Sequence, residues 1–266
     1  MPLAPNPRSV ITGAGGGFGR ALALELAGRG AHLVVSDVNL QAAEETAHAG
    51  TAAGATSVRA VRCDVTKLED VEALAAASGG PVDLVINNAG VSSGGAVGEL
   101  PVKDWRWTLD VDLMGVIHGC HVFVPMLRSQ GRGHVLNVAS AAGLLCAPNM
   151  GAYNVAKAGV IALSETLAGE LVGTPIGVTV VCPTFFQTDI AKSGRFTDER
   201  TKAIAEKFVD RGKTADVVAR AALASCDKGQ LYSVPMADGL WFWRVKRVAP
   251  GLFAKLAGRT AQRMMK

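Results

Sequence analysis

The chain has 266 residues, of which 49% are hydrophobic, so it is long and apolar enough for one large α/β domain with a buried core. This composition excludes an intrinsically disordered chain, and the 31 glycines lack the three-residue period of collagen. Net charge is +4, but residues 240–266 hold seven basic and no acidic side chains, which leaves −3 for residues 1–239. The mildly acidic body argues against nucleic-acid binding.

Two further classes of protein are disfavoured by the sequence. No apolar run reaches the roughly 18 uncharged residues that span a bilayer, and the proline-rich residues 1–8 lack the apolar stretch of a signal peptide. The five cysteines are scattered singly with no CxxC pair, so we expect neither a structural zinc site nor a disulfide framework. We therefore expect free thiols, no bound metal and a cytoplasmic protein.

Short β-rich runs alternate with helical patterns along the chain. Strands are predicted at residues 10–11, 31–36, 57–63, 82–86, 134–140, 176–182 and 230–234. Helices are predicted at 18–29, 40–53, 68–77, 102–130 (as two helices) and 152–172. The strand runs are mostly continuous and apolar, as in parallel strands covered on both faces. The alternation predicts an α/β fold of the Rossmann type, a doubly wound sheet with helices on both faces.

The pattern changes after the strand that ends at residue 182. Residues 184–213 hold one helical pattern, at 198–210, and follow a strand end, where ligands bind in such folds. We interpret this segment as a substrate lid, because Phe185, Phe186 and Ile190 would otherwise be exposed; a surface insertion is the alternative. With no repeat or linker, residues 1–239 are predicted to be a single domain that includes the lid, followed by a C-terminal extension at 240–266.

A glycine-rich loop at residues 12–19 (TGAGGGFG) follows the first strand and opens the first helix. Glycines let the backbone approach a pyrophosphate, and the helix N-terminus offers free N–H groups to the anion. A flexible turn is the alternative, but the strand before the loop and the helix after it favour a dinucleotide site. The predicted cofactor-binding residues here are Thr12, Gly13, Gly15, Gly17, Phe18 and Gly19.

Asp37 ends the second strand, 18 residues after Gly19. A carboxylate at this place accepts hydrogen bonds from the adenosine ribose and repels a 2′-phosphate, which favours NAD over NADP. Asp37 is alternatively a turn residue, and Arg20 is positioned to reach a phosphate, so NADP stays open.

Tyr153 and Lys157 lie four residues apart in a helical segment, so their side chains share one face. A free tyrosine, with a pKa of roughly 10, is a poor base at neutral pH, but a nearby ammonium lowers that pKa. Such a pair can pass a proton to or from an alcohol oxygen, and Ser140 ends the preceding strand, where its hydroxyl can bond the same oxygen. Taken alone, the Tyr-x-x-x-Lys spacing is more typical of a solvated helix face.

These pieces together resemble the short-chain dehydrogenase/reductase family. The resemblance rests on the glycine loop, the sequence Asn87-Asn88-Ala89-Gly90, Ser140 and Tyr153-x-x-x-Lys157, in this order, and covers about residues 8–239. It implies a single-domain Rossmann fold with seven parallel strands, a nicotinamide cofactor, a small-molecule substrate and a homodimer or homotetramer.

The resemblance also implies roles for individual residues. Tyr153 is the general acid/base, Lys157 binds the nicotinamide ribose and lowers the tyrosine pKa, and Ser140 orients the substrate carbonyl. The positions that the family uses to bind the cofactor correspond here to Asp64, Val65, Asn88, Ala89, Gly90, Pro183 and Thr188, together with Tyr153 and Lys157.

Two positions depart from the family pattern. Asp112 stands where the family has an asparagine that supports a water linked to the catalytic lysine. An aspartate keeps the backbone carbonyl and the shape but loses the amide donor, so we include Asp112 in the catalytic set and expect an altered pH profile. Thr184 follows Pro183 where glycine is usual, which leaves the backbone path near the nicotinamide open.

The substrate is expected to be a hydrophobic alcohol or ketone, because the residues expected around the site are mostly apolar. Those assigned to the substrate are Leu145, Met150, Phe185 and Phe186. Arg195 is the nearest arginine and is expected on the lid surface, so no arginine cluster indicates a phosphorylated or carboxylate substrate.

The C-terminal extension repeats apolar residues near helical spacing at 241–256, with basic residues between them, and Pro250 should divide it into two short helices. A basic helix carrying tryptophan and phenylalanine is typical of a peripheral membrane contact. Packing on the body and a dimer contact are the alternatives.

The leading functional hypothesis is an NAD-dependent dehydrogenase or carbonyl reductase that transfers a hydride between the nicotinamide and a secondary alcohol or ketone. An NADP-dependent carbonyl reductase is the rival within the family. A nucleotide-sensing protein without catalysis is the rival from another class, although a sensor has no need of Ser140, Tyr153 and Lys157. A membrane-recruited interaction scaffold rests on the extension alone.

Overall fold

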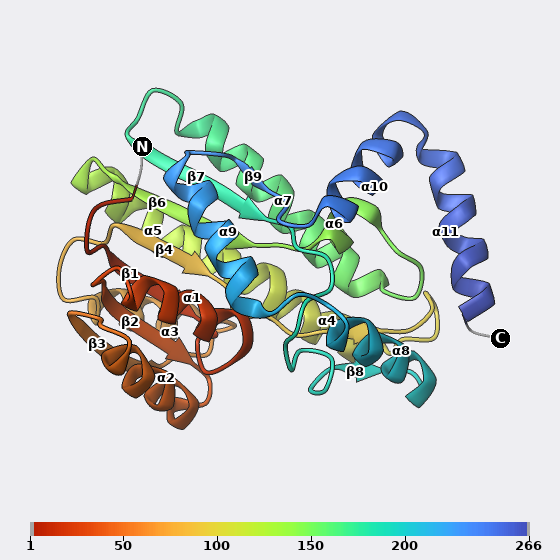
Figure 1. Cartoon of the computed structure of the whole chain (residues 1–266), viewed down its shortest axis with the longest axis horizontal. Helices are drawn as coiled ribbons and strands as arrows, with labels where there is room; N and C mark the ends of the chain where they lie inside the picture. The colour runs from red at the N-terminus through yellow and green to blue at the C-terminus, as the bar shows by residue number, and fades with distance from the viewer. Residues whose placement is uncertain (1–2, 265–266) are drawn as a thin grey trace.

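The computed structural model describes residues 3–264 and has one central sheet of seven parallel strands in the order β3-β2-β1-β4-β6-β7-β9 (Figure 1). The strands are β1 (Arg8–Thr12), β2 (His32–Asp37), β3 (Ser57–Arg62), β4 (Leu84–Asn87), β6 (Gly133–Val138), β7 (Ile176–Val181) and β9 (Tyr232–Ser233). Each predicted strand is present within two residues of its expected bounds. The doubly wound α/β fold is confirmed.

Helices cover both faces of the sheet and bury two apolar cores. On one face lie α1 (Gly17–Ala27), α2 (Leu40–Ala52) and α9 (Ala215–Asp227); on the other lie α3 (Leu68–Ala76), α5 (Gly115–Gln130) and α7 (Gly151–Glu170). Strand β4 is buried at every position, which explains why its sequence is a continuous apolar run rather than an alternating one. The helix α9 has no counterpart among the predicted elements.

Residues 102–130 form one continuous helical stretch rather than the two separate helices predicted. Helix α4 (Val102–Leu109) runs into a π-helical turn, η1 (Asp110–Met114), which runs into α5. Neither proline nor glycine interrupts the junction from Leu109 to Met114, so the backbone stays helical through the wide turn. The stretch is apolar and long enough to cross a membrane, but Phe123 and Leu127 are fully buried against the sheet, as in a soluble core helix.

The segment predicted as a lid contains a short strand that joins it to the body. Strand β8 (Arg195–Phe196) pairs in parallel with β5 (Ser93–Gly94), which follows β4 in the chain. The predicted helix is α8 (Glu199–Asp210), and Asp198 caps its N-terminus by accepting a hydrogen bond from the Thr201 backbone N–H. Neither β5 nor β8 was predicted.

The C-terminal extension forms two helices, α10 (Ala237–Val248) and α11 (Pro250–Met264), at one outer edge of the molecule (Figure 1). Pro250 is the first residue of α11, a place where its missing N–H costs no helical hydrogen bond. The predicted division at Pro250 is confirmed. Helix α10 packs against the short helix α6 (Ala141–Leu145), which begins directly after Ser140.

Candidate active site

The glycine loop connects β1 to α1 at the carboxyl end of β1. Gly13 (φ +63°) and Gly17 (φ +51°) have left-handed backbone conformations, and a Cβ on Gly13 would lie 2.6 Å from the Ala89 Cα. Gly16, the N-cap of α1, has no side-chain cap, and a Cβ there would meet nothing within 4 Å. No side chain therefore caps the N-terminus of α1, which leaves its first N–H groups available to a pyrophosphate.

Asp37 lies against this loop at the end of β2. Its Oδ2 accepts a hydrogen bond from the Gly15 backbone N–H at 3.0 Å, and its Oδ1 accepts one from the Asn39 N–H at 3.0 Å. A Cβ on Gly15 would lie 2.8 Å from Oδ2, so only glycine allows this approach. The carboxylate is held beside the loop, where a ribose would lie.

Thr12 and Asn88 connect the ends of β1 and β4. The Thr12 hydroxyl accepts hydrogen bonds from the Asn88 and Ala89 backbone N–H groups at 3.0 and 3.1 Å. The Asn88 amide donates to the carbonyls of Thr12 and Gly13, both at 2.9 Å. These two side chains are thus occupied in holding the loop. Gly90 follows them, and a Cβ there would lie 3.4 Å from the Lys157 Nζ.

The other residues assigned to the cofactor lie at the same carboxyl edge of the sheet. Asp64 accepts hydrogen bonds from the Thr66 N–H and hydroxyl, and the neighbouring Val65 is buried. Pro183 lies two residues after Val181, the last residue of β7. Thr188 lies beside Gly17 at a cavity of about 350 Å³, which Gln187, Thr188 and Asp189 line from the lid side.

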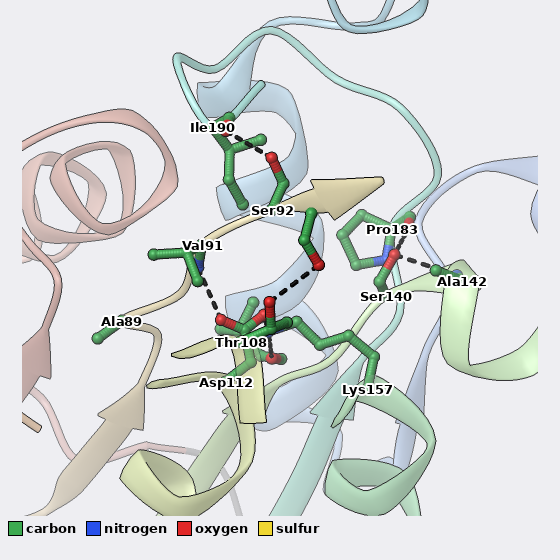
Figure 2. A network of polar contacts seen from close by, with 12 residues as sticks. Ala89, Val91, Ser92, Thr108, Asp112, Ser140, Ala142, Lys157, Pro183 and Ile190 are labelled. Carbon is green, nitrogen blue, oxygen red and sulfur yellow. Dashed lines mark hydrogen bonds and ion pairs between the residues drawn. The ribbon is translucent and has the colours of Figure 1, made fainter. Parts of the chain in front are cut away.

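Lys157 and Ser140 come together with Tyr153 at the middle of this edge. The Lys157 Nζ is 5.6 Å from the centre of the Tyr153 ring and donates to the Val138 carbonyl at 3.1 Å. The Ser140 hydroxyl accepts from the Ala142 N–H at 3.1 Å and points to the Pro183 carbonyl at 3.5 Å (Figure 2). Lys157 is buried, so its charge acts in a medium of low polarity.

Asp112 forms a buried ion pair with Lys157, which the sequence alone did not predict. Its Oδ2 is 3.2 Å from the Lys157 Nζ, and its Oδ1 accepts a hydrogen bond from the Val91 backbone N–H at 2.7 Å (Figure 2). The π-helical turn places Asp112 inward, where its side chain is fully buried. The family asparagine carries no charge, so this ion pair is a property of the present chain.

The charges at the site act on one another. Burial raises the pKa of Tyr153, the Lys157 ammonium and a hydrogen bond from Ser140 lower it, and the Asp112 carboxylate raises it further. Burial also raises the pKa of Asp112, against the opposing effects of Lys157 and the Val91 N–H. Burial by itself would lower the pKa of Lys157, but Asp112 and Tyr153 outweigh it, so the pKa is raised and the amine stays charged. Asp112 thus reduces the effect of Lys157 on the tyrosine.

The residues present fit a nicotinamide dinucleotide. The uncapped N-terminus of α1 is suited to the pyrophosphate, Asp37 to the adenosine ribose, and Lys157 with Tyr153 to the nicotinamide ribose. Among residues 3–264, no cluster of His, Cys, Asp and Glu is arranged to hold a metal ion.

The four residues predicted to contact the substrate lie on different elements near this edge of the sheet. The Phe186 ring packs on Phe18 of α1, with ring centres 5.2 Å apart, and the Phe185 ring stacks on Phe208 of α8 at 5.0 Å. Leu145 is partly buried on α6, and Met150 precedes α7 and bridges to Gly95. Because both phenylalanine rings are engaged by helices, a substrate role for them stays a prediction.

Arg195 attaches the lid to α4, a contact that the sequence did not predict. Arg195 forms an ion pair with Asp104 of α4 at 2.9 Å, and its guanidinium lies 3.9 Å from the centre of the Trp107 ring. The Ser92 hydroxyl donates to the Ile190 carbonyl at 2.7 Å (Figure 2). In the sequence, Asp104 and Trp107 lie three residues apart and so share one face of α4. This spacing does not indicate that Arg195 contacts them.

A comparison with known proteins agrees with this geometry. The profile of short chain dehydrogenases matches residues 8–199. The chain belongs to the short-chain dehydrogenase/reductase family. It is an oxidoreductase that acts on CH–OH groups, and it uses a nicotinamide cofactor.

Three similar proteins illustrate this membership. The oxidoreductase SadH of Mycobacterium tuberculosis is 36% identical over 230 residues, which cover 84% of this chain and 83% of SadH. The cyclohexanol dehydrogenase of an Acinetobacter species is 35% identical over 70% of this chain and 75% of its own length. A family member from Burkholderia phymatum, solved in complex with NAD, is 37% identical, with a TM-score of 0.84 over 92% of this chain and 94% of that one.

Proposed function

We propose that this enzyme transfers a hydride between NAD and a hydrophobic secondary alcohol or ketone, with Tyr153 as the general acid/base. The main support for the proposal is that Tyr153, Lys157 and Ser140 lie together at the same edge of the sheet as the glycine loop, where the N-terminus of α1 has no side-chain cap. The cyclohexanol dehydrogenase relative, which is named for a cyclic secondary alcohol, supports the substrate class.

In this proposal each side chain has one task. The bound nicotinamide supplies the hydride acceptor for oxidation or the hydride donor for reduction. The Tyr153 oxygen takes the proton from the alcohol hydroxyl, or returns it to the carbonyl oxygen in the reverse direction. The Lys157 ammonium stabilises the phenolate, and Ser140 hydrogen-bonds the reacting oxygen and holds it in line. Asp112 acts on the tyrosine through Lys157 and is a positioning residue.

The preference for NAD rests on Asp37. Its carboxylate lies beside the loop with no basic partner among the ion pairs of residues 3–264, so a 2′-phosphate there would meet an uncompensated negative charge. We expect NADH to quench the protein fluorescence at lower concentration than NADPH. Tighter binding of NADPH would favour the rival NADP-dependent carbonyl reductase.

Replacing Tyr153 tests the catalytic assignment. The Tyr153→Phe variant should lose at least 100-fold in turnover of a hydrophobic secondary alcohol, because it removes the proton-transfer group, and should keep its affinity for NADH. The matched control is Tyr232→Phe, which changes the other of the two tyrosines; its hydroxyl donates to Glu165 at 2.6 Å, away from the site. Retained turnover in Tyr153→Phe would remove the tyrosine from the mechanism.

Two further outcomes bear on the wider proposal. Cofactor binding without turnover across a panel of secondary alcohols and ketones would favour a nucleotide-sensing protein. The proposal also includes a homodimer or homotetramer, by analogy with the family, and light scattering after size exclusion measures this directly.

A further inference from the structure

Helices α10 and α11 form a helical hairpin (residues 237–264, the C-terminal hairpin) that contacts the body through α10. The end of α11 also reaches the body, since the Arg200 guanidinium of α8 donates a hydrogen bond to the Met264 carbonyl at 3.4 Å. The Trp243 ring lies 4.9 Å from the ring of Tyr232 in β9. The Lys246 Nζ donates to the Leu144 carbonyl of α6 at 2.7 Å. These contacts place the hairpin on the body in a defined way, so its other surfaces have a fixed orientation.

Away from these contacts, the hairpin exposes several large apolar side chains to solvent. No residue of α11 that the structure describes is buried, and its Phe253 ring lies 6.3 Å from the Phe242 ring of α10. Within the hairpin, the most exposed large apolar side chains are those of Trp241 (60% exposed), Val248 (87%), Leu252 (59%) and Leu256 (50%). They occupy both helices, whereas a hairpin that only completed the fold would bury them.

Basic side chains accompany this apolar surface. Arg244, Lys255, Arg259 and Arg263 lie on the same two helices, and the segment from Leu240 onward has no acidic residue. None of the ion pairs within residues 3–264 involves the hairpin. The basic side chains of the hairpin therefore form no ion pair with a carboxylate among these residues, while residues 1–239 carry a net charge of −3.

We propose that the C-terminal hairpin is a docking surface for an anionic phospholipid membrane. Such a surface buries exposed apolar side chains at the headgroup boundary and attracts the basic residues between them. Trp241 suits this boundary because indole is favoured at membrane–water interfaces. A second copy of the hairpin fits less well, because a symmetric contact would bring the two uncompensated positive surfaces together.

The hairpin begins beside the candidate active site. The Thr184 hydroxyl lies 3.4 Å from the Asp238 Oδ1, and a Cβ on Gly239 would lie 2.7 Å from the Thr184 Cγ2. This step rests on the proposed function. Docking through the hairpin would hold an enzyme for hydrophobic alcohols next to the lipid phase that dissolves those alcohols.

Vesicle sedimentation of the full-length protein tests the proposal without using catalysis. The vesicles are phosphatidylcholine alone and phosphatidylcholine mixed with an equal amount of phosphatidylglycerol. We expect the protein to sediment with the anionic vesicles only, and to be released by high salt. Failure to sediment with the anionic vesicles would overturn the proposal and leave the proposed activity untouched.

Two sets of substitutions locate the binding surface. Lys255→Gln, Arg259→Gln and Arg263→Gln together should weaken binding on the order of a hundredfold, because each basic residue near an anionic surface contributes roughly fivefold. Leu252→Ser with Leu256→Ser should weaken it at least tenfold. The matched controls are Lys67→Gln, Lys103→Gln and Lys228→Gln for charge, and Val97→Ser with Val172→Ser, both 80% exposed, for apolar surface.

The pattern of losses decides the outcome. Binding that falls in the hairpin variants and persists in the controls supports the proposal. Equal losses in both sets would mean that the surface lies elsewhere. Hairpin variants that keep vesicle binding but lower the molar mass by light scattering would identify the hairpin as a contact between subunits instead.

Discussion

At the scale of single residues, the charge of Asp112 distinguishes this proton-transfer site. Its carboxylate faces Lys157 at 3.2 Å and raises the pKa of Tyr153, whereas an asparagine would leave the ammonium free to favour the phenolate. Alcohol oxidation requires the phenolate form. The Asp112→Asn variant should therefore shift the acidic limb of the kcat/KM profile for alcohol oxidation to lower pH.

The matched control for this substitution is Asp110→Asn, on the same π-helical turn. Asp110 is exposed, so solvent screens its charge from the tyrosine, and its substitution should leave the limb in place. Thermal melting of both variants separates a change in titration from a change in folding. An unchanged profile in Asp112→Asn would mean that Asp112 holds Val91 in place without affecting Tyr153.

At the scale of elements, the predicted and observed structures differ where local pattern is weakest. The central strands were predictable because β4 and its neighbours are apolar runs buried on both faces. Strands β5 and β8 have two residues each and pair across about 100 residues of sequence, so neither has a periodic pattern of its own. The π-helical turn at Asp112 lies within a helical segment that has neither proline nor glycine at the turn, so the sequence does not mark it.

The same limits apply to the site. Tyr153, Lys157 and Ser140 follow from spacing and from their place at the end of a strand. The partner of Lys157 does not, because Asp112 reaches it from a different helix. The Arg195–Asp104 ion pair likewise depends on how the lid folds back onto α4.

This ion pair gives a prediction about the lid. Arg195→Met removes the ion pair with Asp104 and the contact with Trp107, so the lid should be held less firmly over the site. We expect KM for the alcohol to rise roughly tenfold, as for the loss of one charge-assisted hydrogen bond, with faster proteolysis within residues 184–213.

The lid itself provides the control. Lys207→Met removes an exposed positive charge of α8 that forms no ion pair among residues 3–264 and so does not link the lid to the body. KM and proteolysis should change little in this variant. A lid that is cleaved equally fast in both variants would show that the Arg195 contact does not hold it down.

The pairing of β6 with β7 gives a prediction about acid stability. Burial lowers the pKa of His134 in β6 to about 4, and its Nε2 lies 2.8 Å from the Thr179 Oγ1 of β7. The unfolded chain binds a proton on this histidine below pH of about 6.5, whereas the folded chain does so only below about 4, so stability falls as the pH drops through this window. The histidine should remove about 2 kcal/mol of unfolding free energy between pH 7 and 5.

Replacing the histidine tests this contribution. Urea unfolding of His134→Gln should show a smaller loss of stability between pH 7 and 5 than the parent chain, even though the variant starts less stable. His48→Gln is the control, because His48 is exposed on α2 and should leave the pH dependence unchanged. Parallel stability curves for His134→Gln and the parent chain would contradict a buried, neutral histidine.

At the scale of the whole molecule, a folded body and an attached hairpin contribute unequally to stability. The body holds both apolar cores, whereas the hairpin reaches the body through Trp243 and Lys246 of α10 and through an exposed hydrogen bond from Arg200 to α11. A chain that ends after Ala249 loses α11 together with the Phe242–Phe253 contact and the exposed hydrogen bond from Arg200, so its melting temperature should fall by about 3 °C or less. Calorimetry measures this against the full chain.

A pair of tryptophans tests the same division within the full chain. Trp243→Ala removes the ring that packs on Tyr232 and should lower the melting temperature by roughly 5–10 °C. Trp241→Ala removes a ring that is 60% exposed, so the melting temperature should fall far less in this variant. The same variant should nevertheless weaken vesicle binding. Stability and membrane attachment would thus depend on different tryptophans two positions apart. Equal melting temperatures in the two variants would show that Trp243 does not anchor the hairpin to the body.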